Sequence, residues 1–117
     1  MPKTVLFGIK NCDSVRKAQK WLHKHEIDFD FHDFRADGLS QTLLASWLKK
    51  LEPKVLINTR STTWKSLDDV AREAALSKTA NAVVLENPTL IKRPVLATGK
   101  HLEVGFDADT YTSLFLK

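Results

Sequence analysis

The opening of the chain carries the pattern that most constrains its fold. Residues 4–7 form a short apolar run that stops at Gly8, which is typical of a strand buried on both faces. From residue 12 or 13 to about residue 25, apolar residues recur at helical spacing among basic ones, and this predicts an amphipathic helix. Phe29 and Phe31 then alternate with polar residues, as in a strand with one inward face. Two strands joined by a helix make a right-handed βαβ unit, so the chain begins as an α/β fold.

The middle of the chain is predicted to be helical. Residues 40–51 show the clearest helical spacing, with Ser40 suited to the N-cap and Pro53 closing the segment. Apolar spacing predicts further helices over residues 67–75 and 80–86.

A polar loop is expected over residues 60–65, ahead of those two helices. Trp64 in this loop is expected either to line a site or to anchor the loop to the core. Trp21 and Trp47 lie on apolar helix faces and are expected in the core.

The last part of the chain predicts a hairpin and a final helix. Residues 95–98 and 101–104 flank Gly99-Lys100, a spacing that suits a tight turn, and Asp107 is placed to cap the last helix. Together with the opening unit, this predicts an α/β fold with one mixed sheet of four strands flanked by helices.

Length and charge exclude several classes of protein. The 117 residues suffice for one compact core. The net charge of +4 is dispersed, with no basic run longer than two residues, so small anions are favoured slightly and direct nucleic-acid binding hardly at all. No long apolar stretch indicates a membrane span, and residues 1–4 lack the apolar core of a secretory signal. We therefore expect a cytoplasmic protein that does not act at a membrane.

Cys12 is the chain's one cysteine, so it cannot form a disulfide within a single chain. It follows the first predicted strand at the start of a helix, where α/β sheets place ligands and where backbone N–H groups favour a thiolate. Lys10 and Arg16 would add to this effect, whereas Asp13 opposes it. The alternative is a buried, inert cysteine, because cysteine is among the residues most often found in cores.

The sequence lacks the residues that phosphatase, metal-binding and nucleotide-binding sites of the usual kinds require. The phosphatase loop needs an arginine six positions after its cysteine, and Ala18 stands there. The histidines have no spacing that suits a shared metal ion, so no metal is expected, and no glycine-rich nucleotide motif is present.

A set of ordered blocks spans the chain: Phe7-Gly-Ile-Lys-Asn-Cys12, Arg16-Lys17-Ala18, Trp21-Leu22, Asn58-Thr-Arg60-Ser61, Asn87-Pro88 with Ile91-Lys-Arg93-Pro94, and Val104-Gly105-Phe106. Together these blocks resemble the arsenate reductase (ArsC) and Spx family, nearest to its YffB-like branch. The resemblance implies a single domain over residues 1–117. Its thioredoxin-like portion would cover about 1–39 and 92–117, with a helical insertion over about 40–91.

The resemblance also implies roles for particular residues. Cys12 matches the nucleophile, and Arg60 and Arg93 match arginines that bind an oxyanion; their planar guanidinium groups suit oxyanions and carboxylates. Pro94 matches a proline that is cis in thioredoxin-like folds and faces the cysteine. Lys10, Asn11 and Arg16 are the further residues expected to contact substrate.

Departures from the family pattern decide between its functions. No arginine follows Arg93, so a third oxyanion ligand is missing, and Val15 replaces both the serine of arsenate reductases and the second cysteine of C-x-x-C regulators. Arsenate reduction is then at most a weak activity coupled to glutathione or glutaredoxin. A disulfide switch within the chain cannot form.

The expected function is a monothiol reductase that works by thiol–disulfide exchange through Cys12. With no resolving thiol of its own, it would use an external one, most simply glutathione as a co-substrate, and no bound cofactor is expected. One alternative is an Spx-like regulatory protein that contacts the RNA polymerase alpha subunit. Another is a globular relic whose cysteine is inert.

Overall fold

The computed structural model describes residues 3–10, 12–79, 82–99 and 101–116, and the chain divides into two compact units. The sheet unit comprises Met1–Ala36 and Arg93–Lys117, and the helical unit comprises Asp37–Lys92. The expected turn residue Lys100 and the first two residues of the helix expected over 80–86 lie outside the described residues.

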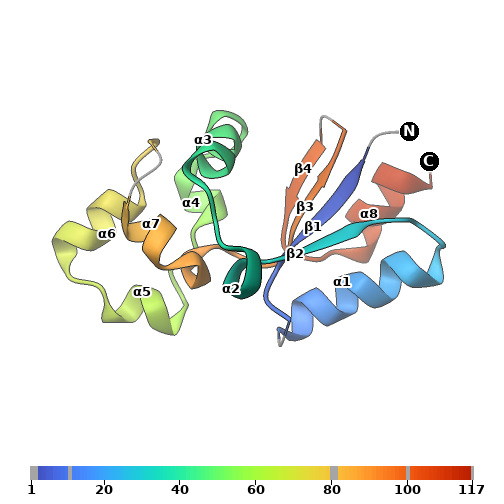
Figure 1. Ribbon diagram of the computed structural model, residues 1–117, viewed down its shortest axis with the longest axis horizontal. Helices are drawn as coiled ribbons and strands as arrows, with labels where there is room; N and C mark the ends of the chain where they lie inside the picture. The colour runs from blue at the N-terminus through green and yellow to red at the C-terminus, as the bar shows by residue number, and fades with distance from the viewer. Residues whose placement is uncertain (1–2, 11, 80–81, 100, 117) are drawn as a thin grey trace. The chain divides into compact units, whose positions relative to one another are not determined.

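The sheet unit contains the predicted four-stranded mixed sheet (Figure 1). Its spatial order is β2-β1-β3-β4, where the strands are β1 (Thr4–Gly8), β2 (Asp30–Asp33), β3 (Val95–Thr98) and β4 (His101–Val104). The β1 and β2 strands are parallel, whereas β3 runs antiparallel to both β1 and β4. The expected α/β, thioredoxin-like arrangement is thus confirmed, including the hairpin, where Gly99 adopts a left-handed φ of 58°.

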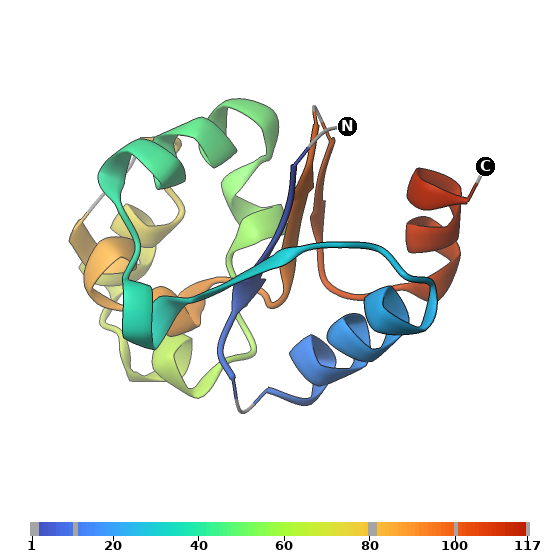
Figure 2. The same ribbon diagram turned by 45° about the vertical axis from the view of Figure 1, so that its right-hand side comes forward.

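One face of this sheet is covered by α1 (Asp13–Lys24) and α8 (Ala108–Phe115), as Figure 2 shows. Each helix turns an apolar stripe inward, and Asp107 caps α8 as predicted by accepting a hydrogen bond from the Thr110 backbone N–H. The core of this face consists of side chains without solvent exposure: Leu6, Val15, Ala18, Leu22, Leu96 and Tyr111.

The start of α1 packs closely against the sheet at Gly8. A Cβ atom built on Gly8 would lie 2.6 Å from Cγ2 of Val15, a residue with no solvent exposure in the first turn of α1. The absence of a side chain at Gly8 is therefore what allows α1 to begin this close to the strand that precedes it.

The helical unit is built from short helices. In chain order these are α2 (Phe34–Asp37), which begins in the sheet unit, then α3 (Gln41–Lys50), α4 (Pro53–Leu56), α5 (Thr62–Ser66), α6 (Asp69–Ala75), α7 (Ala82–Glu86) and the 3-10 helix η1 (Pro88–Leu90). Side-chain oxygens of Ser40, Ser61 and Asp68 cap α3, α5 and α6. An isolated antiparallel bridge joins Ile57, which follows α4, to Ile91, which follows η1.

Several sequence-based predictions for this unit need correction. Residues 62–65 are helical and not part of a loop, because Ser61 accepts a hydrogen bond from the Trp64 N–H and caps α5; Arg60 and Ser61 precede the helix as expected. Pro53 opens α4 as its first residue instead of closing the preceding helix. Val70 is 78% exposed, so it does not share the buried face of α6.

The tryptophans differ from one another in their surroundings. Trp47 is buried, as predicted, whereas Trp21 packs only partly buried against the core. The Arg72 guanidinium carbon lies over the Trp64 ring, 5.6 Å from the centroid of that ring, and this contact connects α5 to α6.

Tyr111 is a polar residue inside the sheet-unit core. Its ring makes edge contacts with Trp21, Phe106 and Phe115, and its hydroxyl has no hydrogen-bond partner among the described residues. Burial raises the pKa of Tyr111 above its ordinary value, and the Glu103 carboxylate raises it further.

We expect Gly8→Ala to lower the free energy of unfolding by about 1–3 kcal/mol, because the new methyl group must push Val15 away. Urea denaturation measures the change. The double variant Gly8→Ala/Val15→Ala serves as the control, since removal of the valine methyls relieves the clash. Strictly additive effects of the two substitutions would contradict a direct contact.

We expect Tyr111→Phe to leave the free energy of unfolding at pH 7 within about 1 kcal/mol of wild type, because the lost hydroxyl has no partner. The difference should appear at alkaline pH. The unfolded phenol titrates near 10.0 while the folded one keeps its proton, so wild-type stability falls as the pH rises above about 10. Urea denaturation at pH 7 and pH 11 should show a smaller alkaline loss in Tyr111→Phe than in wild type, and equal losses would contradict the prediction.

Candidate functional site: the thiol at the start of α1

Cys12 is the N-cap residue of α1, at the start of the helix where the sequence predicted it. Its backbone is extended (φ −99°, ψ 128°), its N–H donates to the Ile9 carbonyl at 3.2 Å, and its carbonyl accepts the Arg16 N–H at 3.0 Å. The thiol is free and half-buried against the apolar core, and its sulfur makes no capping hydrogen bond. The thiol therefore stands at the positive end of a twelve-residue helix while part of it remains open to solvent.

The two charged residues nearest in sequence after Cys12 bind each other. The Arg16 guanidinium donates to Asp13 Oδ1 at 3.4 Å, and both side chains are largely exposed. Such an exposed pair contributes little to stability, but it occupies the cation that the sequence assigned to the thiolate or substrate. Arg16 accordingly neutralises Asp13 in this structure, and a role in substrate contact remains a prediction.

Arg93 and Pro94 reach the Cys12 end of the sheet through strand pairing. Because β3 runs antiparallel to β1 with Val95 opposite Phe7, Pro94 enters the sheet at the end from which β1 leads to Cys12. The Arg93–Pro94 peptide bond is cis, as the resemblance implied; Pro94 is buried, and its carbonyl accepts the Gly105 N–H at 2.8 Å. Arg93 is half-buried beside it.

Arg60 belongs to the helical unit. The Arg60 backbone N–H donates to Asn58 Oδ1 at 3.0 Å, and the Asn58 backbone N–H donates to the Leu90 carbonyl at 2.7 Å. The Arg60 side chain is exposed. These bonds fix the backbone of the turn that carries the guanidinium. Its pairing with Cys12 stays a prediction, because the two residues lie in different units.

The loop before Cys12 contains the other expected contact residues. Ile9 is 5% exposed and anchors the loop in the sheet unit, whereas Lys10 is exposed. Asn11 lies outside the described residues.

No role at the site was predicted for His32 from the sequence, and the structure places this residue at the same end of the sheet as Cys12. It pairs in register with Phe7, and its ring lies 5.1 Å from the Phe7 ring and 6.0 Å from the Phe34 ring. The sequence could have indicated this position for His32, because it lies near the end of the second predicted strand and the parallel strands of a βαβ unit end at the same edge of a sheet.

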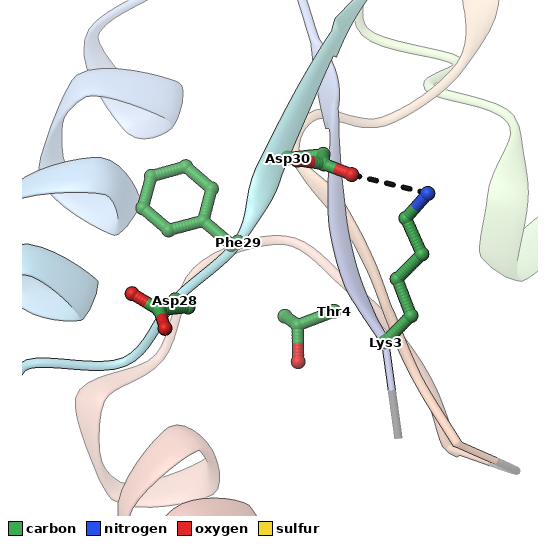
Figure 3. Close-up of a pocket in the computed structure, with 5 residues that line it drawn as sticks. All are labelled: Lys3, Thr4, Asp28, Phe29 and Asp30. Atoms are coloured by element: carbon green, nitrogen blue, oxygen red, sulfur yellow. Dashed lines mark ion pairs between the residues drawn. The ribbon is translucent and has the colours of Figure 1, made fainter. Parts of the chain in front are cut away.

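A surface pocket lies at the opposite end of the sheet (Figure 3). It is lined by Lys3, Thr4, Asp28, Phe29 and Asp30, from the start of β1 and the residues leading into β2. An ion pair of 3.1 Å joins Lys3 to Asp30 there. Since parallel strands begin at one edge and end at the other, this pocket is separate from the thiol.

Neither a metal site nor a membrane span emerges from the residues that the structure describes. Among them, no three His, Cys, Asp or Glu side chains are grouped to share a metal ion. None of the described helices is both long and apolar enough to cross a membrane.

Comparison with known proteins identifies relatives along nearly the whole chain. The family model of the ArsC family matches residues 7–114. The chain is 43% identical over 110 residues to an uncharacterised Haemophilus influenzae protein (94% of this chain, 96% of that one). It is 36% identical over 106 residues to the global transcriptional regulator Spx of Streptococcus pyogenes (89% and 78%).

Two solved structures are similar both in fold and in sequence. One is a YffB protein, with a TM-score of 0.86 and 38% identity over 95% of this chain and 97% of that one. The other is an arsenate reductase (ArsC) related protein from Brucella melitensis, with a TM-score of 0.74 and 36% identity over 97% and 94% of the two chains.

Asp13→Asn should speed alkylation of Cys12 by neutral iodoacetamide at pH 7 by roughly two- to five-fold, because the substitution removes the carboxylate that pairs with Arg16 and leaves one more uncompensated positive charge near the thiol. The matched control is Asp28→Asn, an exposed carboxylate at the pocket end of the sheet. An equal change in both variants would show that net charge, and not the position of Asp13, sets the rate.

Proposed function

The chain belongs to the ArsC family, and on this basis we propose that it is a monothiol reductase that exchanges disulfides through Cys12 with glutathione as reductant. The observation that carries the proposal is the placement of Cys12: a free, half-buried thiol at a helix N-terminus, at the sheet end where Arg93 and cis-Pro94 also lie. The similarity to an arsenate reductase (ArsC) related protein and to the transcriptional regulator Spx supports a thiol-based redox or regulatory role.

The proposed reaction has two exchanges and leaves the enzyme unchanged. The Cys12 thiolate attacks the glutathione sulfur of a substrate–glutathione mixed disulfide; the Cys12–glutathione bond forms and the substrate leaves as its thiolate, which takes up a proton. A second glutathione thiolate then attacks the glutathione sulfur bound to Cys12. Glutathione disulfide leaves and the Cys12 thiolate is restored, so one substrate thiol forms for each glutathione consumed.

Positive charge would guide the glutathione group in both exchanges. Glutathione carries two carboxylates, and a guanidinium can bind a carboxylate through two parallel hydrogen bonds. Arg93 supplies such a group from the sheet unit, and Arg60 from a backbone-fixed turn of the helical unit. The backbone beside Pro94 would face the disulfide being exchanged.

Regulation of transcription is the second candidate, favoured by the 36% identity to Spx. It is tested by binding of the purified RNA polymerase alpha subunit. A complex that forms equally well with wild type and Cys12→Ser, together with no thiol exchange by wild type, would replace the reductase proposal.

In an assay with the small mixed disulfide of glutathione and 2-mercaptoethanol, Cys12→Ser should abolish turnover, because a hydroxyl is a poor nucleophile without an adjacent base. Arg60→Ala and Arg93→Ala should each lower kcat/KM by roughly ten- to a hundred-fold through loss of a charge-assisted hydrogen bond. Lysine at either position should restore only part of the rate, since it keeps the positive charge but cannot form the two parallel hydrogen bonds of a guanidinium.

Lys3→Ala is the control for the arginine variants. Lys3 is an exposed cation paired with Asp30 at the far end of the sheet, so its loss should leave kcat/KM within about two-fold of wild type. A similar loss in all three cation variants would mean that overall charge, and not a binding site, governs the rate. Full activity of Cys12→Ser would overturn the proposed function.

A further inference from the structure

We infer that the oxidised substrate is carried on an acidic peptide segment that docks along a basic stripe on α1, defined here as Lys17, Lys20 and Lys24. This inference rests on the proposed function and names the class of its substrate. The three lysines are exposed, and they are spaced three and four residues apart, so they lie on one face of the helix.

The stripe lies opposite the buried side of α1. Val15, Ala18 and Leu22 face the core, whereas the lysines project from the other side. The only acidic residue within α1 is Asp13, and the 3.4 Å contact with Arg16 engages it. Within the described part of the chain, no carboxylate lies within ion-pair distance of any of the three lysines.

Such a face needs an explanation because like charges at these spacings destabilise a helix slightly. Elsewhere the chain does place carboxylates against its cations, as in the pairs Lys3–Asp30 and Lys78–Glu52. A complementary anionic partner would relieve the repulsion on α1.

The geometry of the helix relates the stripe to the thiol. With a rise of about 1.5 Å per residue, the lysines are displaced about 7, 12 and 18 Å from Cys12 along the axis. An extended peptide advances about 3.3 Å per residue, so a substrate whose mixed disulfide meets Cys12 would bring residues about two to six positions from its cysteine opposite the lysines. Acidic side chains at those positions of the peptide would then lie opposite the three lysines.

An acidic peptide fits this surface better than a nucleic acid does. Three lysines spread over about 10 Å are few compared with the six to ten phosphate contacts of a typical DNA-binding protein. The stripe also starts less than two turns from the thiol, which places a bound segment beside the reacting sulfur and would raise its local concentration there.

The test compares three peptides that each carry one cysteine as a mixed disulfide with glutathione. Positions two, four and six on both sides of the cysteine hold glutamate, glutamine or lysine. With wild-type protein at low salt, kcat/KM for the acidic peptide should exceed that for the glutamine peptide by roughly three- to thirty-fold, and added salt should reduce the ratio.

The variant Lys17→Glu/Lys20→Glu/Lys24→Glu should lose this preference or reverse it. The matched control Lys49→Glu/Lys54→Glu/Lys65→Glu makes the same change in charge at exposed lysines of the helical unit and should keep the preference. Iodoacetamide alkylation of Cys12 and circular dichroism show whether each variant retains its thiol and its fold.

The outcomes separate the inference from the proposed function. If wild type turns over all three peptides and the small disulfide at similar rates, the reductase stands and the acidic substrate is wrong. No turnover of any disulfide would remove the proposed function and the inference with it. If the stripe variant keeps its peptide preference but loses affinity for a single-stranded oligonucleotide, the stripe serves nucleic acid and the inference is overturned.

Discussion

The close packing of α1 on β1 is the contact on which the thiol site depends. Gly8 lets Val15 approach the strand, and Val15 in turn fixes the first turn of the helix whose N-cap is Cys12. The loop between them is short and is held by the buried Ile9 and by the bond from the Cys12 N–H to its carbonyl. The position of the sulfur is therefore set by core packing at one glycine, even though the sulfur itself is partly open to solvent.

The parallel and antiparallel pairings of one strand bring the site together. Because β1 is parallel to β2 and antiparallel to β3, the same sheet edge receives the end of β1, the end of β2 and the start of β3. Cys12 lies beyond the end of β1, His32 lies near the end of β2, and Arg93–Pro94 come directly before β3. The opposite edge holds the pocket around the Lys3–Asp30 pair, so the two ends of one small sheet differ in chemistry.

Features with a periodic pattern could be predicted from the sequence, whereas features set by single contacts could not. The four strands, α1, α3 and α8 follow from apolar spacing and from the Ser40 and Asp107 caps, which the structure confirms. The five-residue α5 has too few residues for a period, and its start depends on one Ser61 hydrogen bond. The Arg16–Asp13 pair was missed because sequence spacing alone does not show whether a cation turns to a thiol or to a carboxylate. The surroundings of His32 depend on strand register, which the sequence left open.

In the proposed reaction, the residue three positions after Cys12 explains why the resolving thiol would come from another molecule. In a C-x-x-C protein this position supplies the second sulfur, next to the first on the helix. Here it is Val15, which is fully buried and in contact with the strand at Gly8, so the position contributes to packing. Under the proposed function, a chain that uses this position for its core would need Cys12 to be accessible to an external thiol and to an oxidised partner. The half-exposure of Cys12, the exposed lysines of α1 and the position of Arg93 at the same sheet end are the features that support the proposed exchange between molecules.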